Sequence, residues 1–130
     1  MYNSEWYINL TKPPYAPPDE VFAPVWSVLY IMLAAALVFY IFKKAENKKS
    51  GYILFVLQLF LNLAWSPVFF LLQNIPAAFG VILLLDIFAL AAAEKFYSVS
   101  KTAGLLMLPY LFWLLFASYL NLGYMLFNVF

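Results

Sequence analysis

The stretch FAPVWSVLYIMLAAALVFYIF, residues 22–42, decides the fold class of this chain. No residue in it carries a charge, and its length is close to the roughly 20 residues that a helix needs to cross a bilayer. Pro24 suits the first turn of a helix, where the missing N–H would have no intrahelical partner in any case. The stretch therefore predicts a transmembrane helix.

Three further apolar runs follow it. Residues 43–51 and 98–102 form polar loops, and the long run between them holds a turn signal at Gln73–Pro76. One straight helix over that run would far exceed a hydrocarbon core of ~30 Å, so the chain must turn there. We predict an all-α membrane protein with a single domain, residues 1–130, and transmembrane helices at about residues 22–42, 52–72, 77–97 and 103–124.

The composition excludes several classes of protein. Hydrophobic residues make up 67% of the chain and charged residues 10%, whereas a soluble domain has roughly a quarter charged residues. The net charge of +1 gives no electrostatic surface for nucleic acid, so no nucleic-acid partner is expected. Cysteine, histidine and arginine are absent. We therefore expect no disulfide, no metal site, no cofactor and no Ser-His or Cys-His nucleophile.

The segment before the first span is rich in proline. Pro13, Pro14, Pro17 and Pro18 cannot lie inside a helix, because each lacks an N–H and its ring clashes with the preceding turn. Residues 1–21 are therefore predicted to form a stiff loop that lies over one end of the bundle as a lid. Two later prolines, Pro67 and Pro109, fall inside predicted spans and should kink them.

The lysines indicate an orientation. Lys12 is the one lysine near the predicted chain ends, whereas the other six lie in or beside the loops after the first and third spans. The positive-inside rule then places both termini on the outer side, for a multi-pass protein of a bacterial cell membrane.

Several aromatic and polar side chains recur at helical spacing, and polar side chains in lipid turn towards the interior of a bundle. Three helix faces can therefore converge on one cavity, where a flat conjugated ligand would stack on aromatic rings. The competing interpretation is that these aromatics are interfacial or packing residues. The faces are Phe22, Trp26 and Tyr30 on the first span; Gln58, Asn62 and Ser66 with Trp65 on the second; and Trp113, Ala117 and Asn121 on the fourth.

Asp86 lies near the middle of the third span, where a charge costs at least ~2.5 kcal/mol on insertion scales. Two interpretations stay open. The carboxyl group either contacts a proton or a polar ligand, or it forms a structural hydrogen bond to another helix.

Three blocks of sequence resemble one known family. They are W-Y-x-x-L-x-K-P-P-x-x-P-P-x-x-x-F-x-P-V-W-x-x-L-Y at residues 6–30, L-N-L-A-W-S-P-V-F-F at 61–70, and P-Y-L-F-W-L-L-F-A-S-Y-L-N at 109–121. Together they resemble the TspO family, also called translocator protein, tryptophan-rich sensory protein or peripheral benzodiazepine receptor. The resemblance covers nearly the whole chain, in the order of the family.

The resemblance implies a five-helix bundle of which this chain would hold helices two to five, without the family's first helix. It also implies a porphyrin site in which Trp26 and Trp113 are the candidates for a catalytic role. Together with the helix faces above, the candidate ligand-binding residues are Tyr15, Phe22, Ala23, Trp26, Tyr30, Asn62, Trp65, Asp86, Tyr110, Trp113, Ala117, Leu120 and Asn121.

Three functions remain open at this point. The first is a receptor for porphyrins or similar flat apolar ligands, with a sensory, scavenging or transport role. The second is an enzyme that degrades porphyrin with light and oxygen. The third is a structural or lipid-organising protein without a pocket. Membrane lipid is an expected partner, and small residues such as Ala34–Ala36 and Ala91–Ala93 allow close helix contact, so a homodimer is also predicted.

Overall fold

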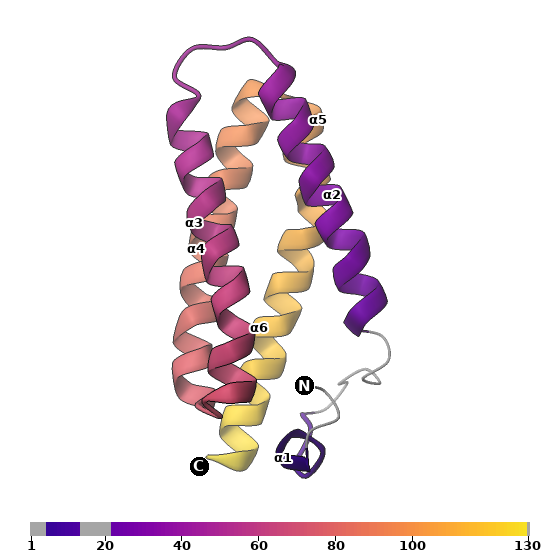
Figure 1. Cartoon of the computed structure of the whole chain (residues 1–130), viewed down its shortest axis with the longest axis vertical. Coiled ribbons are helices and arrows are strands. Elements are labelled where there is room, and N and C mark those ends of the chain that lie inside the picture. The colour runs from indigo at the N-terminus through magenta and orange to yellow at the C-terminus, as the bar shows by residue number, and fades with distance from the viewer. Residues whose placement is uncertain (1–4, 14–21, 130) are drawn as a thin grey trace.

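The computed structural model describes residues 5–13 and 22–129, and all regular secondary structure in this part is helical (Figure 1). Within these described residues, four helical stretches are long and apolar enough to cross a membrane, which confirms the predicted all-α membrane fold. The helices are α1 (Glu5–Ile8), α2 (Phe22–Phe42), α3 (Lys49–Ser66), the π-helix η2 (Pro67–Leu71), α4 (Ile75–Val99), α5 (Lys101–Leu106) and α6 (Leu108–Asn128).

The polar loop between α2 and α3 satisfies backbone groups that the end of α2 leaves open. The Lys48 Nζ donates to the carbonyl oxygens of Ile41 and Lys43, at 2.9 and 2.8 Å. The last carbonyls of a helix have no intrahelical partner and attract a cation, so this lysine is well placed there. The Tyr40 hydroxyl in turn donates to the Lys48 carbonyl oxygen at 2.8 Å, which ties the two helices together at this end.

The predicted turn at residues 73–76 is present. Gln73 has a φ of 53°, and Asn74 is the N-cap of α4, its side-chain oxygen accepting from the Ala77 N–H at 3.1 Å. Pro76 lies in the first turn of α4. Asparagine is among the preferred N-cap residues and proline suits the first helical turn, so the local sequence explains where α4 begins.

Both prolines that were expected to kink a span coincide with a change of helix geometry. At Pro67, α3 passes into the π-helix η2, and the fourth span is broken at Met107, two residues before Pro109. A proline ring clashes with the carbonyl of the residue four positions earlier and removes one helical hydrogen bond. The fourth span therefore consists of two helices, α5 and α6.

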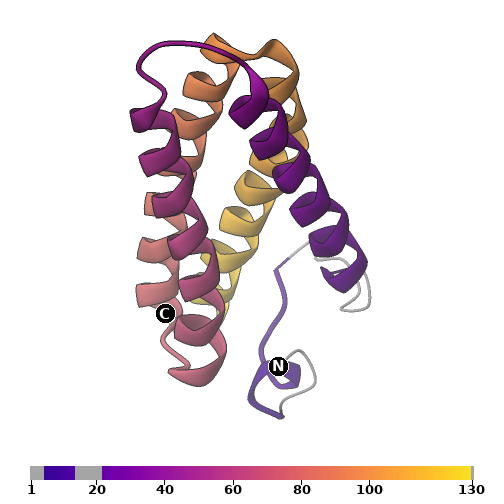
Figure 2. The same cartoon turned by 45° about the horizontal axis from the view of Figure 1, so that its top comes forward.

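The helices pack unevenly. α4 is the central helix and packs along α3, α6 and α5, whereas α2 packs mainly against α5 and hardly against α3. Figures 1 and 2 both show α2 meeting α3 at the loop end and diverging from it towards the other end. The divergence places α2 as a separate wall, opposite the α3–α4–α6 unit.

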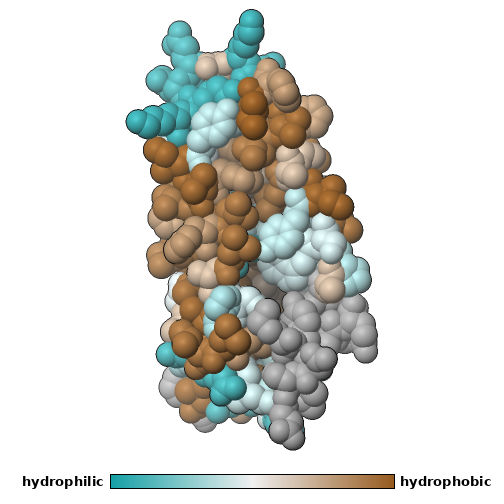
Figure 3. All heavy atoms as spheres, viewed as in Figure 1, coloured by the Kyte–Doolittle hydropathy of each residue, from teal (hydrophilic) through white to brown (hydrophobic). Residues whose placement is uncertain are grey.

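The loop end is held by a compact aromatic core. The Tyr40 ring stacks on Phe96 with ring centroids 4.1 Å apart, and Phe55 stacks on Phe96 at 5.4 Å. Fully buried alanines, Ala36 on α2 and Ala89 on α4, belong to the same core. Large apolar side chains cover much of the outer surface in Figure 3, as lipid contact requires, and hydrophilic side chains gather at the loop end.

The N-terminal segment, residues 5–13, docks on α6 at the opposite end from the loop. The Thr11 N–H donates to the Asn128 side-chain oxygen at 2.7 Å, and the Asn128 amide returns a bond to the Thr11 carbonyl at 2.9 Å. Pro13 lies directly over Gly123, where a Cβ would come within 2.2 Å of the proline. The N-terminal segment and the C-terminal end of α6 therefore lie at the same end of the bundle.

Candidate functional site

A cavity of about 250 Å³ lies between α2 and the unit formed by α3, α4 and α6. Two of the three helix faces that the sequence singled out, those on α2 and α3, supply five of its ten lining residues, and the face on α6 supplies Ala117. Ala23, another candidate from the sequence, also lines it. The residues that line it are Ala23, Trp26, Tyr30, Asn62, Trp65, Ser66, Ile82, Leu85, Leu114 and Ala117.

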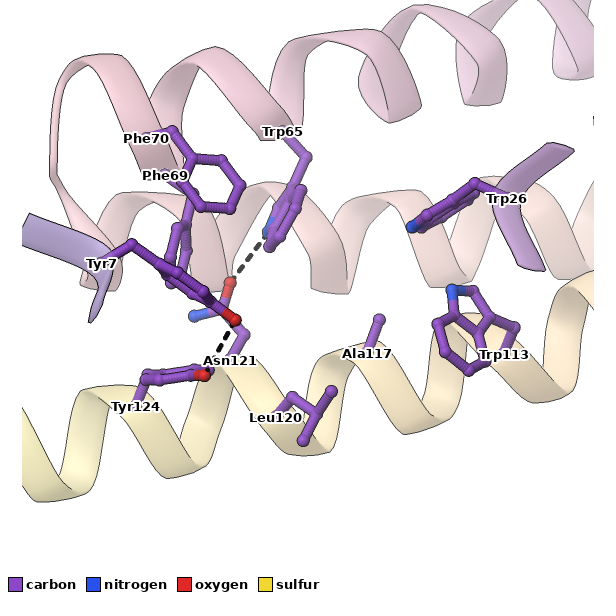
Figure 4. Close-up of a pocket in the computed structure, with 10 residues that line it drawn as sticks. All are labelled: Tyr7, Trp26, Trp65, Phe69, Phe70, Trp113, Ala117, Leu120, Asn121 and Tyr124. Carbon is purple, nitrogen blue, oxygen red and sulfur yellow. Dashed lines mark hydrogen bonds between the residues drawn. The ribbon is translucent and has the colours of Figure 1, made fainter. Parts of the chain in front are cut away.

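Two tryptophans meet at one side of this cavity. The Trp26 ring on α2 and the Trp113 ring on α6 lie edge to face, with centroids 6.2 Å apart and an interplanar angle of 89° (Figure 4). Trp26 also stacks on Tyr30, one turn along the same helix, at 5.7 Å. Edge-to-face and offset arrangements are the favoured geometries of aromatic pairs. The three rings thus form a continuous aromatic surface beside the cavity.

A smaller cavity of about 40 Å³ adjoins the first, because Trp26, Trp65 and Ala117 line both. Figure 4 shows its walls, which come from the N-terminal segment, α2, α3, η2 and α6. The remaining residues around it are Tyr7, Phe69, Phe70, Trp113, Leu120, Asn121 and Tyr124. Tyr7 lies against this wall, and the Tyr124 hydroxyl donates to the Tyr7 hydroxyl at 3.0 Å.

The orientation of Trp65 is fixed by a hydrogen bond. Its indole Nε1 donates to the Asn121 side-chain oxygen at 2.8 Å, and the Asn121 amide donates to the Ile75 carbonyl at 3.3 Å. Asn121 is buried, so both of its side-chain groups need partners. The indole ring is therefore held between the two cavities by a chain of bonds from α3 through α6 to α4.

The polar wall of the larger cavity is part of a buried network. The Tyr30 hydroxyl donates to the Asn62 side-chain oxygen, and the Asn62 amide donates to the Tyr110 hydroxyl at 2.9 Å. The Tyr110 hydroxyl then donates to the Gln58 side-chain oxygen at 2.6 Å. Tyr110 and Gln58 are fully buried, and the Gln58 Nε2 has no hydrogen-bond partner within the described residues. The network links α2, α3 and α6 at the depth of the cavity.

Most of the predicted site residues come together, but two lie apart from the cavity walls. Tyr110 lies behind Asn62 and does not line the larger cavity; its hydroxyl accepts a hydrogen bond from the Asn62 amide. Asp86 accepts a hydrogen bond from the Ser118 hydroxyl at 2.6 Å and borders a separate apolar groove between α4 and α6. This contact corresponds to the second interpretation of Asp86, a structural hydrogen bond to another helix. Tyr15 and the side chain of Phe22 lie outside the described residues.

Sequence patterns missed some of the lining residues. Ile82 and Leu85 belong to an apolar helix in which neighbouring leucines and isoleucines look alike, so no pattern distinguishes the two that face the cavity. Ser66 was recognised as part of a polar stripe but was not proposed as a ligand contact. Tyr7 belongs to the W-Y pair that begins the first sequence block. Nothing in its spacing along the chain indicates that it contacts Tyr124.

Acid-base or metal chemistry has few candidates here. Within the described ranges, no group of three or more histidine, cysteine, aspartate or glutamate residues could hold a metal ion. The groups that line the two cavities are indoles, phenols, phenyl rings, amides, the Ser66 hydroxyl and aliphatic chains. Such a site can bind an apolar conjugated molecule by stacking and can offer a few hydrogen bonds at one wall.

The fold and the site define a multi-pass α-helical membrane protein with a small aromatic cavity between its helices. Comparison with known proteins makes the assignment more specific. Residues 1–126 match the TspO/MBR family, and the chain belongs to this family.

Relatives in bacteria, archaea and animals support the assignment. The chain is 46% identical over 121 residues to the tryptophan-rich protein TspO of Chlorobaculum tepidum, an alignment that covers 91% of this chain and 76% of that protein. It is 40% identical over 123 residues to the protein of the same name from Archaeoglobus fulgidus, covering 95% and 80%. The translocator protein of Ovis aries is 38% identical over 120 residues, covering 89% and 70%.

Proposed function

We propose that this protein is a membrane receptor that binds porphyrins or similar flat apolar ligands, with a role in sensing, scavenging or transport. The observation that carries the proposal is the aromatic cavity, in which Trp26, Trp65 and Tyr30 face a common space from two helices. Stacking on such rings favours conjugated planar molecules, and the surrounding aliphatic side chains exclude water. Membership of a family whose members are named tryptophan-rich sensory protein and translocator protein supports it.

The test is a titration of the purified protein with protoporphyrin, followed by quenching of tryptophan fluorescence. Each aromatic pair is typically worth ~0.5–1.5 kcal/mol beyond the buried area, so removing two faces should weaken binding roughly tenfold to a hundredfold. We therefore expect a rise in Kd of that size for the double variant Trp26→Ala with Trp113→Ala. If the double variant binds porphyrin as tightly as the parent protein, the assignment of the site is wrong.

A second candidate function is favoured by one observation, the direct contact between Trp26 and Trp113. Two electron-rich indoles beside a bound porphyrin would be placed to take part in a light- and oxygen-dependent degradation of the ligand. The double variant Trp26→Phe with Trp113→Phe keeps aromatic faces but removes the indoles. If it binds porphyrin normally and no longer degrades it under illumination, the enzymatic function is favoured over the receptor.

The third candidate, a structural or lipid-organising role without a ligand, would be favoured if the titration showed no binding. The outer-side location of both termini, a bacterial cell membrane and a homodimer stay predictions from the lysine pattern and the small-residue faces.

A further inference from the structure

A long groove runs along the outside of the bundle, between α4 and the fourth span formed by α5 and α6. Its two parts have volumes of about 190 and 240 Å³, and both are lined by Leu90 on α4 and Leu111 on α6, so they are continuous. Most side chains along it are exposed, among them Ile87 at 63%, Leu105 at 54% and Leu115 at 60%. This exposure places the groove on the surface of the molecule.

The groove has the length of one leaflet of a bilayer. It extends along α4 from Asp86 to Tyr97, eleven positions that correspond to about 16 Å of helix. The hydrocarbon core of a bilayer is ~30 Å thick, and each leaflet fills about half of it. Asp86 lies near the middle of α4, which runs from Ile75 to Val99, so the groove begins near the middle of the membrane. It ends at the headgroup region, where α4 and α5 meet at the loop end (Figure 1).

The walls of the groove suit a hydrocarbon chain. In its inner half, leucine and isoleucine side chains form the walls, and Asp86 is the one polar residue that lines it. The Asp86 Oδ2 atom is already engaged, because it accepts from the Ser118 hydroxyl on α6 at 2.6 Å. Such walls offer a bound molecule many dispersion contacts and few hydrogen bonds, which is what an acyl chain can use.

The outer end of the groove carries groups of opposite charge. Glu94 and Tyr97 line it from α4, and Gly104 and Leu105 line it from α5. Lys101 precedes these two α5 residues by three and four positions, so it lies on the same helix face and continues that wall towards the water. Both Glu94 and Lys101 are exposed, and tyrosines such as Tyr97 are typical of the membrane interface. A lipid headgroup at this depth therefore meets a cation and an anion.

We propose that this groove binds one phosphatidylethanolamine molecule, with an acyl chain between α4 and the fourth span and the headgroup at the loop end. The phosphate pairs with the Lys101 ammonium, and the ethanolamine ammonium donates to the Glu94 carboxylate. Phosphatidylglycerol has no cation for Glu94, and the quaternary ammonium of phosphatidylcholine has no N–H to donate. The site is separate from the aromatic cavity, so the inference does not depend on the proposed porphyrin binding.

The headgroup assignment is tested by native mass spectrometry of the full chain in mild detergent, titrated with these three lipids carrying identical acyl chains. We expect one tight adduct, with the lowest Kd for phosphatidylethanolamine. A lysine near the headgroups contributes roughly fivefold in affinity, so Lys101→Gln should raise this Kd by about that factor. Glu94→Gln should remove the preference over phosphatidylglycerol.

The matched control for the charge is Lys44→Gln, which removes an exposed lysine of the loop between α2 and α3 that does not line the groove. It should leave the Kd unchanged. Equal weakening by Lys101→Gln and Lys44→Gln would show that the basic loop end attracts lipid without a defined site. That result, or equal affinity for the three lipids, would overturn the proposal.

The place of the acyl chain is tested with Leu90→Trp, because Leu90 lines both parts of the groove and is 53% exposed. Each methylene kept out of an apolar site costs about fourfold in affinity, so an indole that excludes two or more should raise the Kd about tenfold or more. The control is Leu84→Trp, at a leucine of α4 that is 49% exposed and lines neither part. Unchanged binding by Leu90→Trp, or equal loss in both variants, would overturn the assignment of the groove.

Discussion

The buried network behind the cavity gives the sharpest test of the packing. Tyr110 is fully buried, donates to the Gln58 side-chain oxygen at 2.6 Å and accepts from the Asn62 amide at 2.9 Å. Tyr110→Phe keeps the ring in place and removes both bonds. The Gln58 oxygen and one Asn62 N–H are then left without these partners, in a region that water does not readily reach.

The expected cost follows from the number of bonds. Hydrogen bonds between membrane helices average about 0.6 kcal/mol and reach about 1.7 kcal/mol, and a buried group that loses its partner costs about 1–3 kcal/mol. We therefore expect Tyr110→Phe to lower the free energy of unfolding by about 1–3 kcal/mol. The measurement is reversible unfolding in mixed micelles with increasing denaturing detergent, followed by the circular dichroism of the helices.

Two further variants decide whether the network is the cause. Tyr97→Phe removes the hydroxyl of a half-exposed side chain and should leave the free energy of unfolding nearly unchanged. Gln58→Leu combined with Tyr110→Phe removes the orphaned glutamine as well as the hydroxyl, so it should recover part of the lost stability. If Tyr110→Phe is as stable as Tyr97→Phe, or if the double variant is less stable than the sum of the two single variants, the reasoning is refuted.

Two other predictions concern the ends of the bundle. Gly123→Ala places a Cβ within 2.2 Å of Pro13, so it should lift the N-terminal segment and speed its cleavage by protease, whereas Gly80→Ala meets nothing within 4 Å and should cleave like the parent. Asn74→Ala removes the cap bond to the Ala77 N–H and should destabilise the protein by about 1 kcal/mol in the same unfolding assay; an unchanged midpoint would contradict the cap.

The membrane fold could be predicted because its signal is local. Residues 22–42 carry no charge and are followed by lysines, and the predicted bounds of this helix are those of α2. The fourth span shows the limit of that signal. Its predicted start was residue 103, but the helix begins at Lys101, because Ser100 caps it by accepting from the Ala103 N–H at 3.3 Å. The polar loop at residues 98–102 contains two serines, and the sequence did not indicate that Ser100 would be the N-cap.

The site could be predicted only in part. Helical spacing placed Trp26 with Tyr30, and Asn62 with Trp65, on the faces that line the larger cavity. Spacing says nothing about contacts between distant segments, such as the bond between Tyr7 and Tyr124, which are separated by 117 residues. Spacing also could not show that α2 stands away from α3, because that separation depends on the packing of α3 along α4 and of α2 against α5.

Different interactions fix the two sides of the cavity. A substitution on one side is therefore expected to affect other properties than a substitution on the other side. On the α3–α6 side, bonds fix Trp65 through Asn121 and Asn62 through Tyr110. On the α2 side, the helix is anchored at the loop end by the Tyr40 stack and packs mainly against α5. A substitution among the hydrogen-bonded residues on the α3–α6 side changes both the shape of the site and the stability of the protein. Removing the Tyr30 hydroxyl breaks the bond between α2 and α3 while the anchored end of α2 stays intact, so its effect on the site is separate from the packing at the loop end.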